Sequence, residues 1–416
     1  MNFRKNPSIW VPLLYFTQGL PYVLVVSVSV ILYKRLGLSN AEIGLYTSWL
    51  YLPWVLKPLW SPIVDLQYQK KSWYVSMQMI IAFCFIIAGL LIPTQWFLVS
   101  TLACFWMVAF ASATNDIATD GYYLMALSQR QQSLFIGIRS LFYRFAMLTG
   151  QGGLVVLAGY FEMKYGDNAK AWSLTMLISG ILMAVLALKN WWFTPAIEED
   201  KSSSSTSFLE VFKSFFEKKQ ILYAIAFILT YRLGESQLVK MASPFMLDEK
   251  TAGGLALSTQ TIGSIYGTLG VIALSTGGIL GGIVISKHGL KRWMFPMLIS
   301  LNLPNLCYLL LSSFQIDNLF WISTTVILEQ FGYGFGFAAF LIYLIFLAEG
   351  PTKTAHYAIA TGVMALGMML PGMVSGYIQQ VLGYELFFVW VLLCAIPAFL
   401  IARKLNYPET YGKNSA

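Results

Sequence analysis

Charged side chains inside long apolar runs are the residues of this sequence best suited to bind a ligand or a proton. Placing a charge within a membrane is expensive, so such residues are expected to bind a ligand or protons, or to form structural pairs. The surplus of two bases over acids favours an anionic ligand, although Lys57 and Lys240 could instead extend to the interface. The full set comprises the bases Lys57, Arg139, Arg144, Arg232 and Lys240 and the acids Asp116, Glu235 and Glu329.

Arg144 is the first candidate for binding a ligand. Ser140 and Gln151 stand at helical spacings of four and seven around it, which predicts a polar stripe on one helix face. Arg144 lies about 11 residues into its run, or roughly 16 Å deep at 1.5 Å per residue. The alternative is a buried ion pair with an acid of another helix. Gln18 and Tyr333 complete the predicted binding residues.

Two acids are candidates for binding a proton. Arg232 and Glu235 are three residues apart on one helix face. They predict either a self-neutralised pair or a carboxyl that alternates between a proton and Arg232. Glu329 has no base on its own helix and is the second candidate, with Tyr333 one turn away. Structural roles for these acids remain the alternative.

A third group lies near the end of the fourth run. Asp116 and Asp120 are four residues apart and share a helix face, and a short loop leads from them towards Arg139. An acid–base cluster of these residues is expected, serving as a gate or a structural contact, with direct ligand binding as the alternative.

Apolar runs must position all of these residues. The chain has 416 residues, of which 57% are hydrophobic and 11% charged, and its mean hydropathy is +0.65. A soluble domain carries about 25% charged residues, so most of this surface is expected to meet lipid. Each run is long enough to cross about 30 Å of hydrocarbon as a helix. The runs are 10–33, 41–63, 73–93, 96–119, 133–160, 170–193, 220–247, 258–285, 293–313, 319–348, 355–381 and 384–403.

The longest polar stretch divides these runs into six and six. It contains Glu198 to Lys201 and the serine run Ser202 to Ser205, a composition typical of a solvated linker. The apolar residues between 208 and 216 could form a short surface helix there. The predicted domains are 1–194 and 220–416, each a six-helix bundle, joined by a cytoplasmic linker at 195–219.

The basic residues set the expected orientation. With the N-terminus inside, seventeen Lys and Arg fall on the cytoplasmic side and five on the other. This asymmetry predicts a multi-pass protein with both termini in the cytoplasm. The net charge of +8 is spread over short loops, which argues against nucleic acid as a partner. The four cysteines and two histidines are scattered, so neither a metal site nor a cofactor is expected.

A loop after the eighth run carries the clearest short motif. Gly282, Ser286, Lys287, Gly289, Lys291 and Arg292 resemble the loop signature of the major facilitator superfamily, with Ser286 at the position of its acid. Asp65 and Lys70 hold the corresponding place in the first half. The resemblance implies a twelve-helix fold in two halves and a cytoplasmic gate formed by these charged residues. Positive-inside charge alone is the alternative.

A second resemblance is more specific. Thr17 to Pro21, Leu56 to Asp65, Ser112 to Tyr122 and Gly137 to Gly153 are similar to motifs of the AmpG-type muropeptide permeases and the related acetyl-coenzyme A transporters. Asn115 stands where that family has Gln, and Lys57-Pro58 where it has Lys-Phe.

The resemblance implies a secondary transporter of the cell inner membrane that imports an anionic amphipathic solute, such as an anhydromuropeptide, with protons. Its expected partners are a small-molecule solute, protons and the surrounding lipid bilayer. The expected oligomeric state is a monomer. A siderophore or an acyl-coenzyme A is the alternative cargo, and a non-transporting receptor the alternative class. An enzyme is not expected, because no H-E-x-x-H, G-x-S-x-G or paired-histidine motif occurs. No Walker loop is present either, which favours coupling to an ion gradient.

Overall fold

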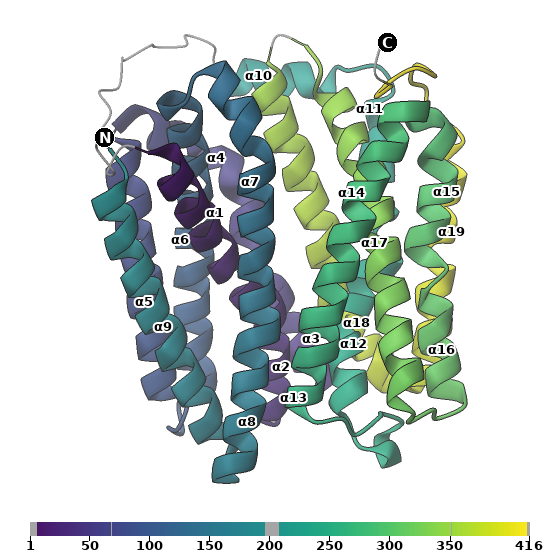
Figure 1. The fold of residues 1–416 in the computed structure, drawn as a ribbon. Coiled ribbons are helices and arrows are strands. Elements are labelled where there is room, and N and C mark those ends of the chain that lie inside the picture. The colour runs from purple at the N-terminus through teal and green to yellow at the C-terminus, as the bar shows by residue number, and fades with distance from the viewer. Residues whose placement is uncertain (1–5, 68, 196–207, 351, 414–416) are drawn as a thin grey trace. The chain divides into compact units, whose positions relative to one another are not determined.

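The computed structural model describes residues 6–67, 69–195, 208–350 and 352–413, and over these ranges it consists of helices and their connections, without strands (Figure 1). Up to the central linker the elements are α1 (Pro7–Val23), η2 (Leu24–Val28), α2 (Ser29–Arg35), α3 (Asn40–Trp49), α4 (Leu52–Gln67), α5 (Lys70–Leu91), α6 (Phe97–Ala126), α7 (Gln129–Met147), η3 (Leu148–Leu154), α8 (Val155–Tyr165) and α9 (Asn168–Phe193). After it come α10 (Phe208–Phe216), α11 (Ile221–Tyr231), α12 (Leu233–Leu247), η4 (Lys250–Ala252), α13 (Thr259–Ile262), η5 (Gly263–Gly270), α14 (Val271–His288), α15 (Leu290–Asn302), α16 (Asn305–Ser313), α17 (Leu319–Ala348), α18 (Lys353–Leu393) and α19 (Ile396–Ala402).

Nine helical stretches among the described residues are long and apolar enough to cross a membrane. They cover ten of the twelve predicted runs, because Ala355–Ala402 contains the last two. Those two runs meet at Gly383, whose φ of 72° and ψ of 171° interrupt α18. The nine stretches are Pro7–Arg35, Lys70–Leu91, Phe97–Ala126, Gly137–Tyr165, Asn168–Phe193, Thr259–His288, Leu290–Ser313, Leu319–Ala348 and Ala355–Ala402.

The second and seventh predicted runs are each broken into two shorter helices. The break between α3 and α4 precedes Pro53, which cannot donate a backbone hydrogen bond and disfavours a helical residue before it. The break between α11 and α12 falls at Arg232, whose φ of −111° and ψ of 19° leave the helical region. Helices are therefore present at all twelve predicted runs, and the all-helical membrane fold is confirmed.

In the described part of the chain, three spans contain π-helical segments: η2, η3 and η5. A π-helical turn holds more residues than an α-helical one, so side chains beyond it rotate relative to those before it. The η3 segment Leu148–Leu154 begins after Arg144 and includes Gln151. The predicted stripe assumed a regular α-helix; Ser140 and Arg144 both lie within α7, whereas η3 turns Gln151 away from the direction expected for it.

By their packing, the residues form two compact units. Unit 1 comprises Met1–Gly37, Leu59–Ser203 and Ser258–Gly267, and unit 2 comprises Leu38–Pro58, Ser204–Leu257 and Thr268–Ala416. Each unit thus includes a short segment from the other half of the sequence: Ser258–Gly267 in unit 1 and Leu38–Pro58 in unit 2. The division at 195–219 stays a prediction about domain boundaries.

Close backbone contacts at glycines attach these two segments. In unit 2, a Cβ on Gly376 of α18 would overlap the carbonyl of Asn40, at the start of α3. In unit 1, a Cβ on Gly267 of η5 would overlap the carbonyl of Gln151 in η3. Only glycine permits backbones to approach this closely, so these residues hold the segments to their units.

Aromatic residues dominate the core of each unit. In unit 1, Trp10, Tyr74 and Tyr122 are buried together, and their rings meet edge to face at 5.2 and 5.4 Å. In unit 2, Tyr231 stacks on Phe340 with 4.5 Å between ring centroids. Edge-to-face and offset rings are the favoured arrangements of aromatic pairs.

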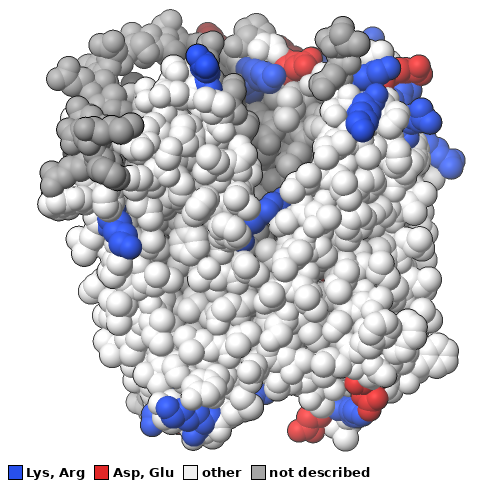
Figure 2. Space-filling model, viewed as in Figure 1, with Lys and Arg blue, Asp and Glu red and all other residues white. Residues whose placement is uncertain are grey.

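The surface distribution of charge fits a membrane protein. On the face shown in Figure 2, most Lys, Arg, Asp and Glu side chains lie near the ends of the helices, with a broad band of other residues between them. Many large apolar side chains within the spans are exposed, among them Phe83, Ile181 and Leu386 at 61%, 58% and 55%. Such exposure suits contact with lipid rather than water.

The predicted short helix in the linker is present as α10. Phe215 is fully buried against the core of unit 2, Phe212 packs against that core, and Phe216 is exposed. Positions 196–207 of the linker lie outside the described residues.

Candidate solute and ion sites in the two units

Unit 1 contains an acid–base cluster between α1, α6 and α7. Arg139 lies 3.4 Å from a carboxylate oxygen of Asp120, and the Tyr15 hydroxyl donates to the same oxygen at 2.9 Å. The guanidinium also lies over the rings of Tyr15 and Tyr123, at 4.5 and 5.2 Å from their centroids. The structure therefore brings together the predicted pair of Asp120 and Arg139. Cation–π contact with two tyrosines adds partners that spacing could not predict.

The predicted binding residues of unit 1 have different surroundings. Arg144 is half-buried on α7, Ser140 is exposed, and Gln151 is buried in η3. Gln18 on α1 is 7% exposed, and its Oε1 atom accepts no hydrogen bond. A buried carbonyl oxygen without a donor is unusual, so Gln18 has capacity left for a ligand. Asp116, one turn before Asp120, is half-buried.

A chain of buried amides joins four helices of unit 1. Asn190 donates to Thr17 and to Gln78, each at 3.0 Å, and Gln78 donates to Asn115 at 3.0 Å. Residues of α1, α5, α6 and α9 are thereby connected. Sequence reasoning missed this chain because it concentrated on ionisable groups. The signal was Asn115, within the motif at Ser112 to Tyr122.

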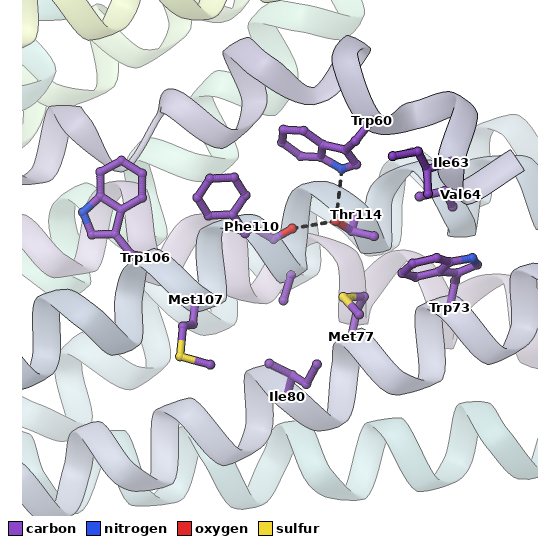
Figure 3. Close-up of a pocket in the computed structure, with 11 residues that line it drawn as sticks. Trp60, Ile63, Val64, Trp73, Met77, Ile80, Trp106, Met107, Phe110 and Thr114 are labelled. Carbon is purple, nitrogen blue, oxygen red and sulfur yellow. Dashed lines mark hydrogen bonds between the residues drawn. The ribbon is translucent and has the colours of Figure 1, made fainter. Parts of the chain in front are cut away.

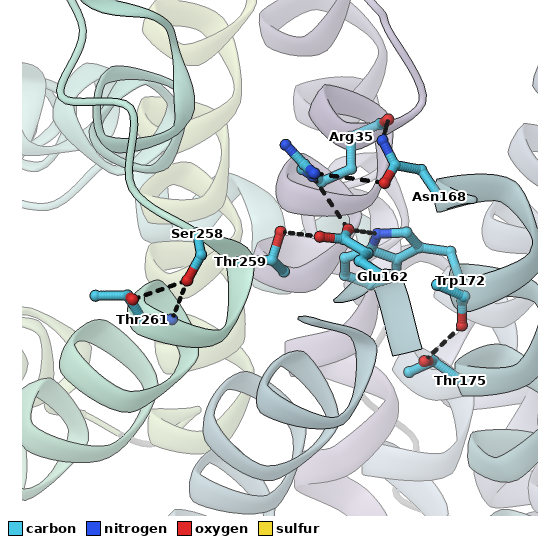
Figure 4. A network of polar contacts seen from close by, with 9 residues as sticks. Arg35, Glu162, Asn168, Trp172, Thr175, Ser258, Thr259 and Thr261 are labelled. Atoms are coloured by element: carbon cyan, nitrogen blue, oxygen red, sulfur yellow. Dashed lines mark hydrogen bonds and ion pairs between the residues drawn. The ribbon is translucent and has the colours of Figure 1, made fainter. Parts of the chain in front are cut away.

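A second polar cluster in unit 1 surrounds Glu162 of α8 (Figure 4). Its carboxylate accepts from Arg35 at 3.1 Å, from Trp172 at 2.9 Å and from Thr259 at 2.7 Å. Asn168 adds a bond from its amide to the carbonyl of Arg35 at 3.0 Å. Thr259 belongs to the segment Ser258–Gly267, so this cluster fixes that segment to α2, α8 and α9.

In unit 2, the predicted Arg232–Glu235 pair forms with both carboxylate oxygens engaged. The Arg232 Nε and Nη2 atoms donate to Glu235 at 2.7 and 3.1 Å. Nη2 also donates to the Tyr333 hydroxyl at 2.8 Å, and the guanidinium lies 4.9 Å from the centroids of the Tyr333 and Phe337 rings. Glu235 is 1% exposed and Arg232 8%. The pair is thus buried and charge-balanced, and a bidentate geometry is the strongest form of such contacts.

Glu329, the second buried acid of unit 2, accepts hydrogen bonds from a neutral amide rather than from a base. It is 1% exposed, and the neighbouring Gln330 side chain donates to its two oxygens at 2.9 and 3.1 Å. The hydroxyl of Tyr308 is near enough for an electrostatic interaction with Glu329 and has no hydrogen-bond partner. On the same turn as Tyr308, the amide of Asn305 is buried and unpartnered at both atoms. The Tyr308 hydroxyl is therefore a polar group with spare hydrogen-bonding capacity close to this acid.

Five of the predicted gate residues lie towards helix ends: Asp65, Lys70, Lys287, Lys291 and Arg292. Lys291 is paired with Glu409 at 3.0 Å, and Lys287 and Arg292 are exposed. Lys70 is 4% exposed and donates to the Val64 carbonyl at 3.0 Å. Asp65 lies in α4, and its side chain is outside the described residues.

Charged groups outside the spans form local contacts with clear electrostatic effects. Lys250 donates to Asp317 at 2.7 Å, and this bond holds the pKa of the Asp317 carboxyl below its ordinary value. Burial, together with a hydrogen bond to Glu349 at 2.9 Å, raises the pKa of the Tyr411 phenol. These contacts join loops and termini and lie away from the buried charges.

An apolar groove on unit 1 lies between α4, α5 and α6, with a volume of about 610 Å³ (Figure 3). Its lining is uncharged and consists of Trp60, Ile63, Val64, Trp73, Met77, Ile80, Trp106, Met107, Phe110, Ala111 and Thr114. The indole of Trp60 donates to Thr114 at 3.2 Å, so these two polar groups are already paired. This chemistry suits a lipid chain better than an anionic solute. Among the described residues, no group of three or more His, Cys, Asp or Glu could hold a metal ion.

Comparison with known proteins identifies the family. The model of the Major Facilitator Superfamily matches residues 13–348. The anhydromuropeptide permease of Escherichia coli is 24% identical over 409 residues, which cover 96% of this chain and 79% of that protein. The putative transporter AmpG 4 of Rickettsia conorii is 25% identical over 419 residues, or 95% of each chain.

Solved structures agree on the fold. The nucleoside transporter NupG superposes with a TM-score of 0.70 at 20% identity, over 97% of this chain and 98% of that one. A D-xylose-proton symporter gives 0.71 at 13% identity, over 98% and 99%. Together with the family match, these similarities confirm the predicted class, a transporter rather than an enzyme. The chain belongs to the Major Facilitator Superfamily and is a multi-pass membrane transporter.

Proposed function

We propose that this transporter imports an anionic amphipathic solute of the anhydromuropeptide type across the inner membrane, together with protons. The observation that carries the proposal is the similarity, over 95% and 96% of the chain, to proteins named as AmpG and anhydromuropeptide permease. Five bases against three acids within the predicted spans fit a solute that carries carboxylates. The active unit is a monomer, and nucleic acid has no part in its function.

In unit 1, Arg144 and Gln18 are the proposed contacts with the solute, and Ser140 and Gln151 are the further candidates. A guanidinium can bind a carboxylate through two parallel hydrogen bonds, and the unpaired Oε1 of Gln18 can accept from a sugar hydroxyl or a peptide amide. Asp120 and Arg139 serve as part of the gate, together with Asp116, Asp65, Lys70, Lys287, Lys291 and Arg292.

In unit 2, Glu329 is the preferred acid for proton coupling. Glu235 already has both oxygens bound by Arg232, so releasing it to take a proton would strand a buried guanidinium. Glu329 can gain or lose a proton without breaking an ion pair. In this proposal Tyr333 orients Arg232 through their hydrogen bond, in place of the direct contact with the solute expected from the sequence.

Experiments can distinguish this proposal from two other transported solutes and from a non-transporting receptor. A siderophore or an acyl-coenzyme A would also present anionic groups to Arg144. Thermal-shift measurements with anhydromuropeptides, siderophores and coenzyme A esters should give stabilisation by the first class, since a ligand at 100 times its Kd adds about 2.7 kcal/mol. Counterflow in proteoliposomes separates a transporter from a receptor, which would bind the solute without moving it.

Replacing Arg144 by Lys should weaken solute binding. The substitution keeps the charge but loses the planar fork that binds a carboxylate at two points. We expect affinity for an anhydromuropeptide to fall about tenfold, as expected for one lost charged hydrogen bond, with unchanged yield and thermal stability. Binding as tight as that of the parent would remove Arg144 from the site. The matched control is Arg130→Lys, on an exposed base of the same helix.

Both termini and the linker should face the cytoplasm. Glu217 follows α10 and Asp317 precedes α17, and their side chains are 63% and 67% exposed. In a cysteine-free background, an impermeant maleimide added to intact cells should label Asp317→Cys and spare Glu217→Cys until the cells are opened. Labelling of Glu217→Cys in intact cells would reverse the orientation.

A further inference from the structure

Lys240 of α12 is a buried cation with no part in the solute contacts, the gate or the proton coupling proposed for this transporter. Its side chain is 1% exposed, and it is among the largest fully buried side chains of the described residues. The sequence allowed it to reach outward to the interface, and the structure shows that this expectation is wrong. The lysine points into unit 2 rather than towards lipid headgroups.

The ammonium group has weak partners for so deep a charge. It donates to the Thr47 hydroxyl at 2.9 Å and lies 5.2 Å from the centroid of the Tyr51 ring. An ammonium carries three donors, and no carboxylate among the described residues pairs with it. Arg232, another buried cation of unit 2, has both oxygens of Glu235. Compared with Arg232, Lys240 therefore lacks an anionic partner to balance its charge.

A second donor beside Lys240 is also unused. Ser48 is fully buried on α3, next to Thr47, and its hydroxyl has no hydrogen-bond partner. Buried hydroxyls are normally satisfied. The Ser48 hydroxyl and the Lys240 ammonium can therefore each donate a further hydrogen bond to an acceptor.

Gly372 of α18 packs closely against this place. A Cβ on Gly372 would lie 2.5 Å from Ser48 Oγ and 3.5 Å from Cγ of Lys240. Any larger residue would press on the serine hydroxyl and approach the lysine stem. The glycine thus lets Ser48 of α3 and the stem of Lys240 of α12 approach α18 at the same point.

We propose that Lys240 and Ser48 form a subsite for a carboxylate of the transported solute. The proposal rests on the proposed function and specifies one chemical group of that solute. A carboxylate offers oxygens to both the ammonium and the hydroxyl, and it supplies the charge that Lys240 lacks. α3 and α18 cover the subsite in this structure, and the helix movements of alternating access expose it in another state.

The test compares two probes on three variants. The probes are an anhydromuropeptide with free peptide carboxylates and the same compound with every carboxyl converted to an amide. Lys240→Met keeps the length of the side chain and removes its charge. Ser48→Ala removes the unused hydroxyl. Lys189→Met, on an exposed lysine of α9, is the matched control.

Lys240→Met should lower affinity for the acid about 10- to 100-fold, and affinity for the amide less than about twofold. Ser48→Ala should lower affinity for the acid about fivefold, and Lys189→Met should change neither. Because Lys240→Met removes an uncompensated buried charge, its thermal midpoint without ligand should equal or exceed that of the parent.

Other outcomes overturn the inference in recognisable ways. Equal losses for acid and amide with a lowered midpoint would make Lys240 a structural tie between α12 and α3. If Lys240→Met does not fold, an unchanged acid affinity of Ser48→Ala rejects the subsite. If the parent binds neither probe, the proposed function fails instead, which separates the two failures.

Discussion

Glu329→Gln should abolish accumulation of the solute in response to a proton gradient and leave exchange intact. The amide has nearly the shape of the protonated acid, and Gln330 remains beside it. A gradient of one pH unit provides about 1.36 kcal/mol per proton, so the parent should concentrate the solute up to about tenfold. The variant should stop at equal concentrations inside and outside. Proteoliposomes loaded with unlabelled solute measure exchange and accumulation in the same preparation.

The controls separate coupling from structure. Glu249→Gln, at an exposed acid, should behave as the parent in both assays. Glu235→Gln should reduce exchange and accumulation together, because Arg232 loses its carboxylate. If Glu329→Gln still concentrates solute under the imposed gradient, Glu329 is not the coupling acid. Accumulation that survives in Glu235→Gln as well would move the search to Asp116 and Asp120.

Arg232→Gln should strongly destabilise the protein. It leaves the Glu235 carboxylate buried at 1% exposure without its base. Breaking a buried pair from one side costs about 3–5 kcal/mol. The thermal midpoint in detergent should fall clearly, and the double variant Arg232→Gln/Glu235→Gln should recover most of the loss because neither charge remains.

An exposed ion pair provides the comparison. Lys250 and Asp317 lie 2.7 Å apart with side chains 53% and 67% exposed, and solvated pairs of this kind contribute little. Lys250→Gln should therefore leave the midpoint unchanged. A double Arg232/Glu235 variant as unstable as Arg232→Gln alone would show that the loss comes from the contact with Tyr333 and from packing.

The sequence predicted those parts of the sites that depend on spacing along one helix. Arg232 and Glu235, three residues apart, form the expected pair, whereas the contact with Tyr333 joins α12 to α17 and had no local signal. Asp120 and Arg139 were expected to cluster because a short loop connects their helices. The two tyrosines that flank Arg139 could not be chosen from the 23 in the chain.

Local irregularity explains the incorrect expectations. The seven-residue spacing of Arg144 and Gln151 gives one face only in an α-helix, and η3 changes that rotation. Lys240 was allowed an outward direction because hydropathy does not say which face of a span meets lipid. Its burial depends on α3, which packs with residues more than three hundred positions later in the chain, such as Gly376.

That dependence has a consequence for how the protein is made. During synthesis, residues 40–49 leave the ribosome long before Gly376. Asn40 must wait for Gln379 and Tyr384, which accept its hydrogen bonds at 2.7 and 2.8 Å. A nascent chain halted at the linker therefore holds α3 without the residues that accept the hydrogen bonds of Asn40. Partly packed intermediates are prone to misassembly, and α3 reaches its final packing only when synthesis is almost complete.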